Sequence, residues 1–137
     1  MKLAILLLAL FASPTYAAGR VNHLMFLGGT VHLVATWTNG PNGSPAESLL
    51  RAEWVDGATH TLIEAPGSFD VRIFMPAMGH GSSPTQLNRV LDGQGRPIPG
   101  AYQVAGIYFT MPGDWEVRVT LRTPDGKSET ESFPVHL

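Results

Sequence analysis

The sequence predicts an all-β protein, an antiparallel immunoglobulin-like β-sandwich of about seven strands. Three observations predict it: apolar and polar residues alternate in several short runs, clusters of Gly, Pro and Asn separate these runs, and no convincing helical pattern is present. The chain has 137 residues, including 15 Gly and 11 Pro, which suits one domain with many turns. An eight-stranded barrel and a cupredoxin-like sandwich are the competing layouts.

The expected strands follow one another with turn signals between them. In residues 30–37, Val31, Leu33 and Trp37 share one face, and an NGPNG cluster ends the run. The two runs on either side of the Pro112-Gly113 turn have the strongest hairpin pattern in the chain. Trp37, Trp54 and Trp115 are expected in the core. The further expected strands cover residues 48–55, 69–75, 86–92, 101–111, 115–122 and 131–137.

Residues 1–17 have the features of a secretory signal peptide. Lys2 precedes an apolar run at residues 3–12, and small residues suited to cleavage lead up to Ala17. The run is too short for a mature membrane-spanning helix, and an uncleaved membrane anchor is the alternative. We therefore expect a soluble, periplasmic or otherwise extracytoplasmic protein, with no membrane association indicated after cleavage. Its expected parts are an N-terminal segment, residues 18–27, and one domain, residues 28–137.

Charge, cysteine content and motifs narrow the classes of function. Without Lys2 the chain keeps eight basic residues against 11 acidic ones, so it lacks the excess of positive charge that nucleic-acid binding needs. The chain has no cysteine, so a soft-metal site would have to use methionine and histidine instead of thiolates. The G-x-S-x-G and H-E-x-x-H motifs and a glycine-rich phosphate loop are missing from the sequence, and we do not expect an enzyme.

Residues 75–81 read MPAMGHG and carry two thioethers and an imidazole in one short loop, at Met75, Met78 and His80. If successive strands run antiparallel, residues 69–75 and 101–111 end at the same end of the sandwich, which places Met111 beside this loop. The alternative is that Met75 and Met111 only fill the core and that His80 is a solvated loop residue.

The chemistry of this donor set favours copper. Thioethers suit Cu(I) far better than Zn²⁺, Mg²⁺ or Ca²⁺, and one imidazole is a poor basis for a Cu(II) site unless His23, His32, His60 or His136 lies alongside. We therefore expect Cu(I) rather than Cu(II). His23 and Met25, two residues apart, form a secondary metal candidate, although a role without metal is favoured for both. His32 is expected to be exposed to solvent, on the face of its strand opposite the core.

The MPAMGHG loop, followed by GIYFTMPGDWEVRVTL at residues 106–121, resembles the YtkA-like domain family, which is related to the FixH-type accessory proteins. The resemblance covers residues 28–137. It implies a small exported immunoglobulin-like sandwich with a role near copper handling or cytochrome oxidase assembly. It also implies a copper site at Met75, Met78 and His80, with Met111 less directly indicated. Many family members keep a membrane anchor or a lipid-attachment cysteine, and this chain has no cysteine.

Two functions remain open from the sequence. The first is a Cu(I) carrier or buffer that passes copper to a protein acceptor or an oxidase-assembly partner. The second is a metal-free immunoglobulin-like interaction module that assists the assembly of an envelope or membrane complex. The two differ in whether replacing Met78 and His80 removes a property of the folded protein.

Overall fold

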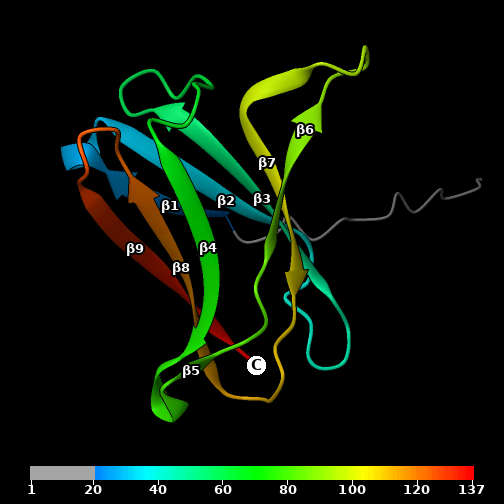
Figure 1. The fold of residues 1–137 in the computed structure, drawn as a ribbon. Coiled ribbons are helices and arrows are strands. Elements are labelled where there is room, and N and C mark those ends of the chain that lie inside the picture. The colour runs from blue at the N-terminus through cyan, green and yellow to red at the C-terminus, as the bar shows by residue number, and fades with distance from the viewer. Residues whose placement is uncertain (1–20) are drawn as a thin grey trace, which may run out of the picture.

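The computed structural model describes residues 21–137, which form two facing antiparallel sheets (Figure 1). The predicted antiparallel β-sandwich is confirmed, and the alternative of a closed barrel is not, because the described strands are divided between two separate sheets. The predicted signal peptide, residues 1–17, lies outside the described residues. Within residues 21–137, no helix has the length and apolar character needed to cross a membrane.

One sheet has five strands and the other has four, against the total of about seven expected. The five-stranded sheet has the order β1-β2-β3-β7-β6, with β1 Val21–Phe26, β2 Val31–Asn39, β3 Ser48–Asp56, β7 Pro97–Ile107 and β6 Gln86–Leu91. The four-stranded sheet has the order β5-β4-β8-β9, with β5 His80–Gly81, β4 Ser68–Met75, β8 Asp114–Arg122 and β9 Ser128–His136. Two 3-10 turns, η1 Leu27–Gly29 and η2 Pro76–Met78, follow β1 and β4.

The core lies between the sheets and follows the predicted alternation. In β2 the burial pattern alternates at every position from Val31 to Trp37, so one face of the strand enters the core. Trp54 and Trp115 are also buried, as expected from the sequence. Aromatic rings pack against one another across the core, with Phe109 between Trp37 and Trp115. A continuous apolar core therefore holds both ends of the sandwich in place.

The hairpin predicted around Pro112 and Gly113 is wrong. β7 pairs with β3 and β6 in the five-stranded sheet, whereas β8 pairs with β4 and β9 in the other sheet. Residues 108–113 therefore cross from one sheet to the other. Alternation shows which side chains face the core, but the pattern is the same for strands that pair and for strands in opposite sheets.

The five-stranded sheet begins inside the segment 18–27, which was expected to precede the domain. β1 pairs with β2 along its whole length, from Val21 opposite Thr36 to Phe26 opposite Val31. Phe26 is fully buried, so this strand contributes to the core. The outward-facing residues of β1 consequently lie beside those of β2.

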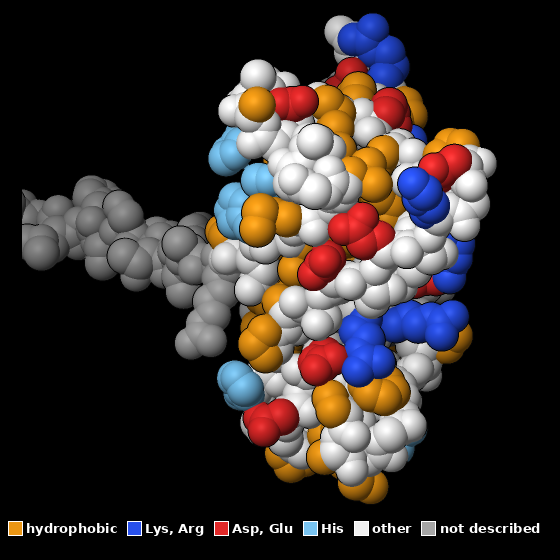
Figure 2. Space-filling view, turned by 90° about the vertical axis from the view of Figure 1, so that its left-hand side faces the viewer, with side chains coloured by type: hydrophobic (Ala, Val, Ile, Leu, Met, Phe, Trp, Pro, Cys, Tyr) orange, Lys and Arg blue, Asp and Glu red, His pale blue; other side chains and the backbone are white. Residues whose placement is uncertain are grey.

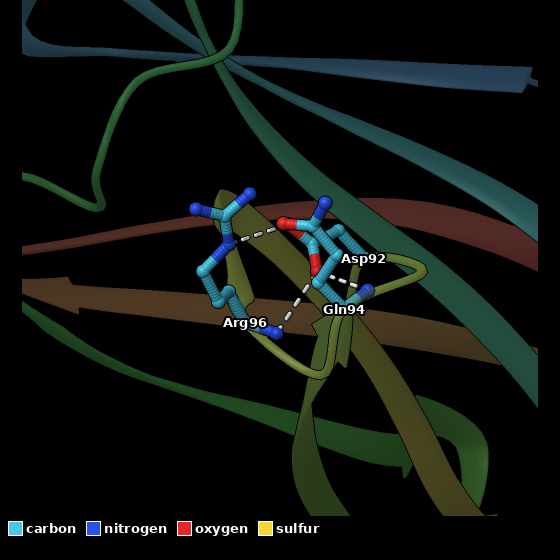
Figure 3. A network of polar contacts seen from close by, with 3 residues as sticks. All are labelled: Asp92, Gln94 and Arg96. Carbon is cyan, nitrogen blue, oxygen red and sulfur yellow. Dashed lines mark hydrogen bonds and ion pairs between the residues drawn. The ribbon is translucent and has the colours of Figure 1, made fainter.

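The turn between β6 and β7 is closed by a carboxylate (Figure 3). Asp92 Oδ1 accepts hydrogen bonds from the backbone N–H groups of Gln94 at 2.8 Å and Arg96 at 2.9 Å. The Arg96 side chain adds an ion pair at 3.2 Å. The backbone N–H groups of Arg96 and Gln94 lower the pKa of Asp92, because they stabilise its charged form.

The sandwich has two ends with different side-chain chemistry. At the lower end in Figure 1, β4 ends, β8 begins and β9 ends. At the upper end, the Leu27 N–H of η1 donates to Glu129 Oε2 near the start of β9, at 3.0 Å. The seven residue-to-residue steps from Glu129 to His136 in β9 correspond to about 23 Å of extended strand. Side chains at the two ends therefore cannot share one metal ion.

Candidate metal site

The MPAMGHG loop is a tight, hydrogen-bonded return at the lower end of the sandwich. β4 ends at Met75, and Pro76 begins η2, where its fixed φ suits the first turn of a helix. Gly79 has a φ of 64°, in the left-handed region that glycine tolerates, and its N–H donates to the Met75 carbonyl at 3.1 Å. The chain then returns as β5, so the loop holds its donor residues on a defined backbone.

The strand register places the first methionine and the histidine of the loop side by side. Met75 is the direct partner of His80 in the antiparallel pairing of β4 with β5. Residues directly opposite each other in such a pair have Cβ atoms about 4.5–5.5 Å apart. The register therefore puts a methionine and a histidine at neighbouring backbone positions, with the Met75 side chain in the core and the His80 side chain exposed.

Met111 reaches the same end of the sandwich from the other sheet. Its carbonyl accepts a hydrogen bond from Trp115 Nε1 at 3.0 Å, which fastens the crossing segment to the buried indole. The Met75 Cε atom lies 3.1 Å from the point where a side chain on Gly113 would begin. The methyl group of Met75 therefore packs against the turn that follows Met111, which is the placement expected from the strand directions.

The four predicted donor residues differ in exposure. Met75 is 3% exposed and belongs to the hydrophobic core, whereas Met78 is 56% exposed and Met111 is 36% exposed. His80 is exposed, and its Nδ1 lies 3.3 Å from the carbonyl oxygen of Gly81. The lower end thus has one buried thioether, two accessible thioethers and one accessible imidazole, which are soft and borderline donors.

A second histidine lies at the lower end, which sequence analysis named only as a possibility. His136 in β9 is opposite Asp114 in β8, and its Nδ1 lies 2.6 Å from Asp114 Oδ1. The β8–β9 register was available in the sequence, because pairing the two runs symmetrically around the PDG turn at residues 124–126 sets Asp114 against His136.

His80 also lies on the wall of a groove between β4 and the segment that leads to β6. The groove has a volume of about 750 Å³ and is lined by Phe74, Arg72 and Arg118 as well as by His80. The Arg118 guanidinium carbon lies 3.7 Å from the centre of the Phe74 ring. The loop is therefore accessible from a hollow of the surface as well as from the end of the sandwich.

The remaining histidines are not at this site. His23, His32 and His60 gather near the upper end, where the ring centroids of His32 and His60 are 5.6 Å apart. The expectation that His32 is simply exposed is wrong, because this side chain is half-buried. Across residues 21–137, no three His, Asp or Glu side chains form a ready-made metal chelate in the observed rotamers.

Comparison with solved structures finds proteins whose fold is similar to that of this chain. FetP of uropathogenic Escherichia coli strain F11, expressed in the periplasm, is 13% identical, with a TM-score of 0.56 over 88% of this chain and 93% of FetP. A copper-bound variant of FetP is 14% identical, with a TM-score of 0.54 over 88% of this chain and 92% of the variant. No family model and no curated protein matches the chain. The similarity to FetP therefore shows the fold, and membership of the YtkA-like family stays a prediction.

Proposed function

We propose that this protein binds copper at the lower end of the sandwich and acts as an extracytoplasmic Cu(I) carrier or buffer. The observation that carries the proposal is the pairing of Met75 with His80, with the Met111 turn packed against Met75. Met78 supplies a further thioether from η2. Two to four such donors suit Cu(I), which prefers soft ligands and tolerates low coordination numbers.

The exposure of the donors supports a carrier rather than a permanently buried metal centre. Met78, Met111 and His80 are accessible to solvent, so a protein acceptor could replace them one ligand at a time. Thioethers are neutral and need no deprotonation to bind, so release does not require a change in pH. The function is therefore binding and transfer, without a catalytic step.

Three further observations, on a protein of similar fold, on the N-terminal sequence and on the family resemblance, support the proposal. A protein of the same fold has been observed with bound copper. The apolar N-terminal sequence is typical of a signal peptide, which supports export. The resemblance to the YtkA-like family supports copper delivery, and an acceptor in oxidase assembly is the partner that this resemblance favours.

The test is a Cu(I) competition titration of the purified, tag-free protein against a chromophoric chelator without oxygen. The wild type is expected to take a stoichiometric amount of copper from the chelator. A folded double variant, Met78→Ala with His80→Ala, is expected to lose at least about tenfold in affinity, which corresponds to about 1.4 kcal/mol. The matched control is His23→Ala with Met25→Ala, because it removes one imidazole and one thioether at the upper end.

The alternative is a metal-free interaction module, and one observation favours it. Met75 is 3% exposed, so packing alone explains its presence. The partly exposed Met78, Met111 and Tyr108 would then offer apolar surface to a partner protein. Equal titration curves for the wild type and the Met78/His80 double variant would exclude the copper site and favour this alternative.

A further inference from the structure

Three imidazoles and a thioether lie together near the upper end, on the outer face of the five-stranded sheet. His23 and Met25 both project outward from β1, and Met25 is the direct partner of His32 in β2. His60 comes from the loop after β3, and its ring lies 5.6 Å from that of His32 and 6.5 Å from that of His23. Figure 2 shows histidine side chains gathered on this face beside exposed hydrophobic side chains.

His32 is held with one ring nitrogen ready to act as a ligand. Its Nε2 lies 3.1 Å from the carbonyl oxygen of Gly29, and because a carbonyl only accepts, Nε2 must carry the proton. Nδ1 of the neutral ring therefore has a free lone pair, and this atom is buried without a hydrogen-bond partner. A backbone carbonyl that fixes the tautomer of an imidazole is the usual support of a metal-binding histidine.

The loop that carries His60 is fixed to the same piece of backbone. The Gly57 N–H donates to the Thr30 carbonyl at 2.9 Å, and a side chain on Gly57 would begin 2.1 Å from the Gly29 oxygen. Only glycine therefore allows this close contact. The carbonyl that orients His32 and the loop that presents His60 are packed against each other.

A carboxylate shapes the last part of this loop. Asp56 Oδ1 accepts hydrogen bonds from the backbone N–H groups of Ala58 and Thr59, both at 2.9 Å. The His60 N–H also donates to the Asp56 carbonyl at 2.8 Å, so these bonds fix the backbone that leads to His60. His60 itself has a φ of 58°, a left-handed conformation that is uncommon for residues other than glycine. The backbone thus holds His60 over the sheet in an unfavourable conformation.

Two of the three distances between the rings fall within the range expected around a single metal ion. Two imidazoles whose nitrogens bind one ion at about 2.0–2.1 Å have ring centroids about 4.5–6.5 Å apart, depending on the angle at the metal. The His32–His60 distance lies inside this range, and the His23–His60 distance lies at its upper limit. His23 and His60 are exposed, so their rings have room to rotate toward His32.

We propose that His32 Nδ1, His60 and His23 bind a divalent transition-metal ion, with Met25 as a weak fourth ligand. Among the common divalent ions such a nitrogen-rich set binds Cu(II) most tightly. The site goes beyond the function proposed above, because it lies at the other end of the sandwich and uses mainly nitrogen donors.

The test is Cu(II) titration of the purified, tag-free protein, followed by electron paramagnetic resonance. The wild type is expected to bind Cu(II) with nitrogen hyperfine structure in its spectrum. His60→Asn keeps a residue that tolerates the left-handed backbone, and His32→Gln keeps a donor for the Gly29 carbonyl. Each of the two variants is expected to bind Cu(II) at least about tenfold more weakly, since even loss of a supporting residue costs about 10–100-fold.

The control is the double variant Met78→Ala with His80→Ala, which is expected to keep the Cu(II) spectrum and affinity of the wild type. This result would hold even if the protein failed to bind Cu(I), so the two proposals can fail separately. An unchanged affinity and spectrum in both His60→Asn and His32→Gln would place the bound Cu(II) elsewhere and overturn the inference. Loss of the spectrum in the Met78/His80 variant alone would overturn it as well.

Discussion

Replacement of Met75 separates the packing role of this residue from its proposed role as a copper ligand. Met75 is 3% exposed and its methyl group packs against the turn at Gly113. Truncation of a buried methionine to alanine costs about 2–5 kcal/mol, and the lower part of this range applies because the turn at the end of the sandwich can partly fill the space. We expect Met75→Ala to lower the free energy of unfolding by about 2–3 kcal/mol.

Met75→Leu supplies the comparison, because it keeps the apolar volume and removes the sulfur. This change is expected to cost less than about 1.5 kcal/mol. Urea unfolding followed by tryptophan fluorescence measures both values, because all three tryptophans are buried, and an unchanged slope shows that the same structure unfolds. If Met75 is a ligand, Met75→Leu weakens Cu(I) binding while the protein remains stable.

Two results would refute this reasoning. A decrease of less than about 1 kcal/mol in the free energy of unfolding for Met75→Ala would show that the Met75 side chain is not closely packed in the core. Equal destabilisation by Met75→Leu and Met75→Ala would show that the site depends on the shape of methionine rather than on its apolar volume.

Two further predictions concern turns of the five-stranded sheet. Gly57→Ala is expected to cost about 1–3 kcal/mol in urea unfolding, because its Cβ would meet the Gly29 oxygen, whereas Gly93→Ala, with open space around it, should change little. The pKa of Asp92 is lowered in the folded protein, chiefly by the Arg96 backbone N–H, so its stabilising effect is present above the unfolded pKa and is lost as pH falls through the folded pKa. Thermal unfolding of Asp92→Asn is therefore expected to depend less on pH in the acidic range than that of the wild type, and an identical dependence would contradict this.

The alternation of apolar and polar residues along the sequence predicts some features of the fold and not others. It identifies which side chains of β2 and β8 face the core, because a strand buried on one face alternates with a period of two. It does not identify the neighbouring strand, so the runs before and after Pro112 were wrongly paired as a hairpin. The position of Met111 was nevertheless predicted, because it depends on the directions of the strands and not on which strands pair: β4 and β7 both run toward the lower end (Figure 1).

The histidine cluster shows what sequence reasoning could not reach. His23 and Met25 share a face by spacing alone, and this was recognised. His60 joins them only because Gly57 fits against the Gly29–Thr30 backbone, a contact between segments distant in sequence. The orientation of the His32 ring likewise depends on the Gly29 carbonyl, a partner that no pattern of residue types specifies.

Each proposed donor set joins residues of a pair of strands to a residue from a loop beyond the strands, and this has a physical cause. Within a pair of strands each side chain is committed either to the core or to a regular outer face. At the ends, left-handed residues such as Gly79 and His60 reverse the chain sharply and bring side chains from different segments together. Because the two sets rest on separate turns over a common core, either can be altered without unfolding the other, and substitutions at the two ends should have additive effects. The fold can therefore keep a thioether-rich site and an imidazole-rich site at opposite ends of one small protein, each suited to a different ion.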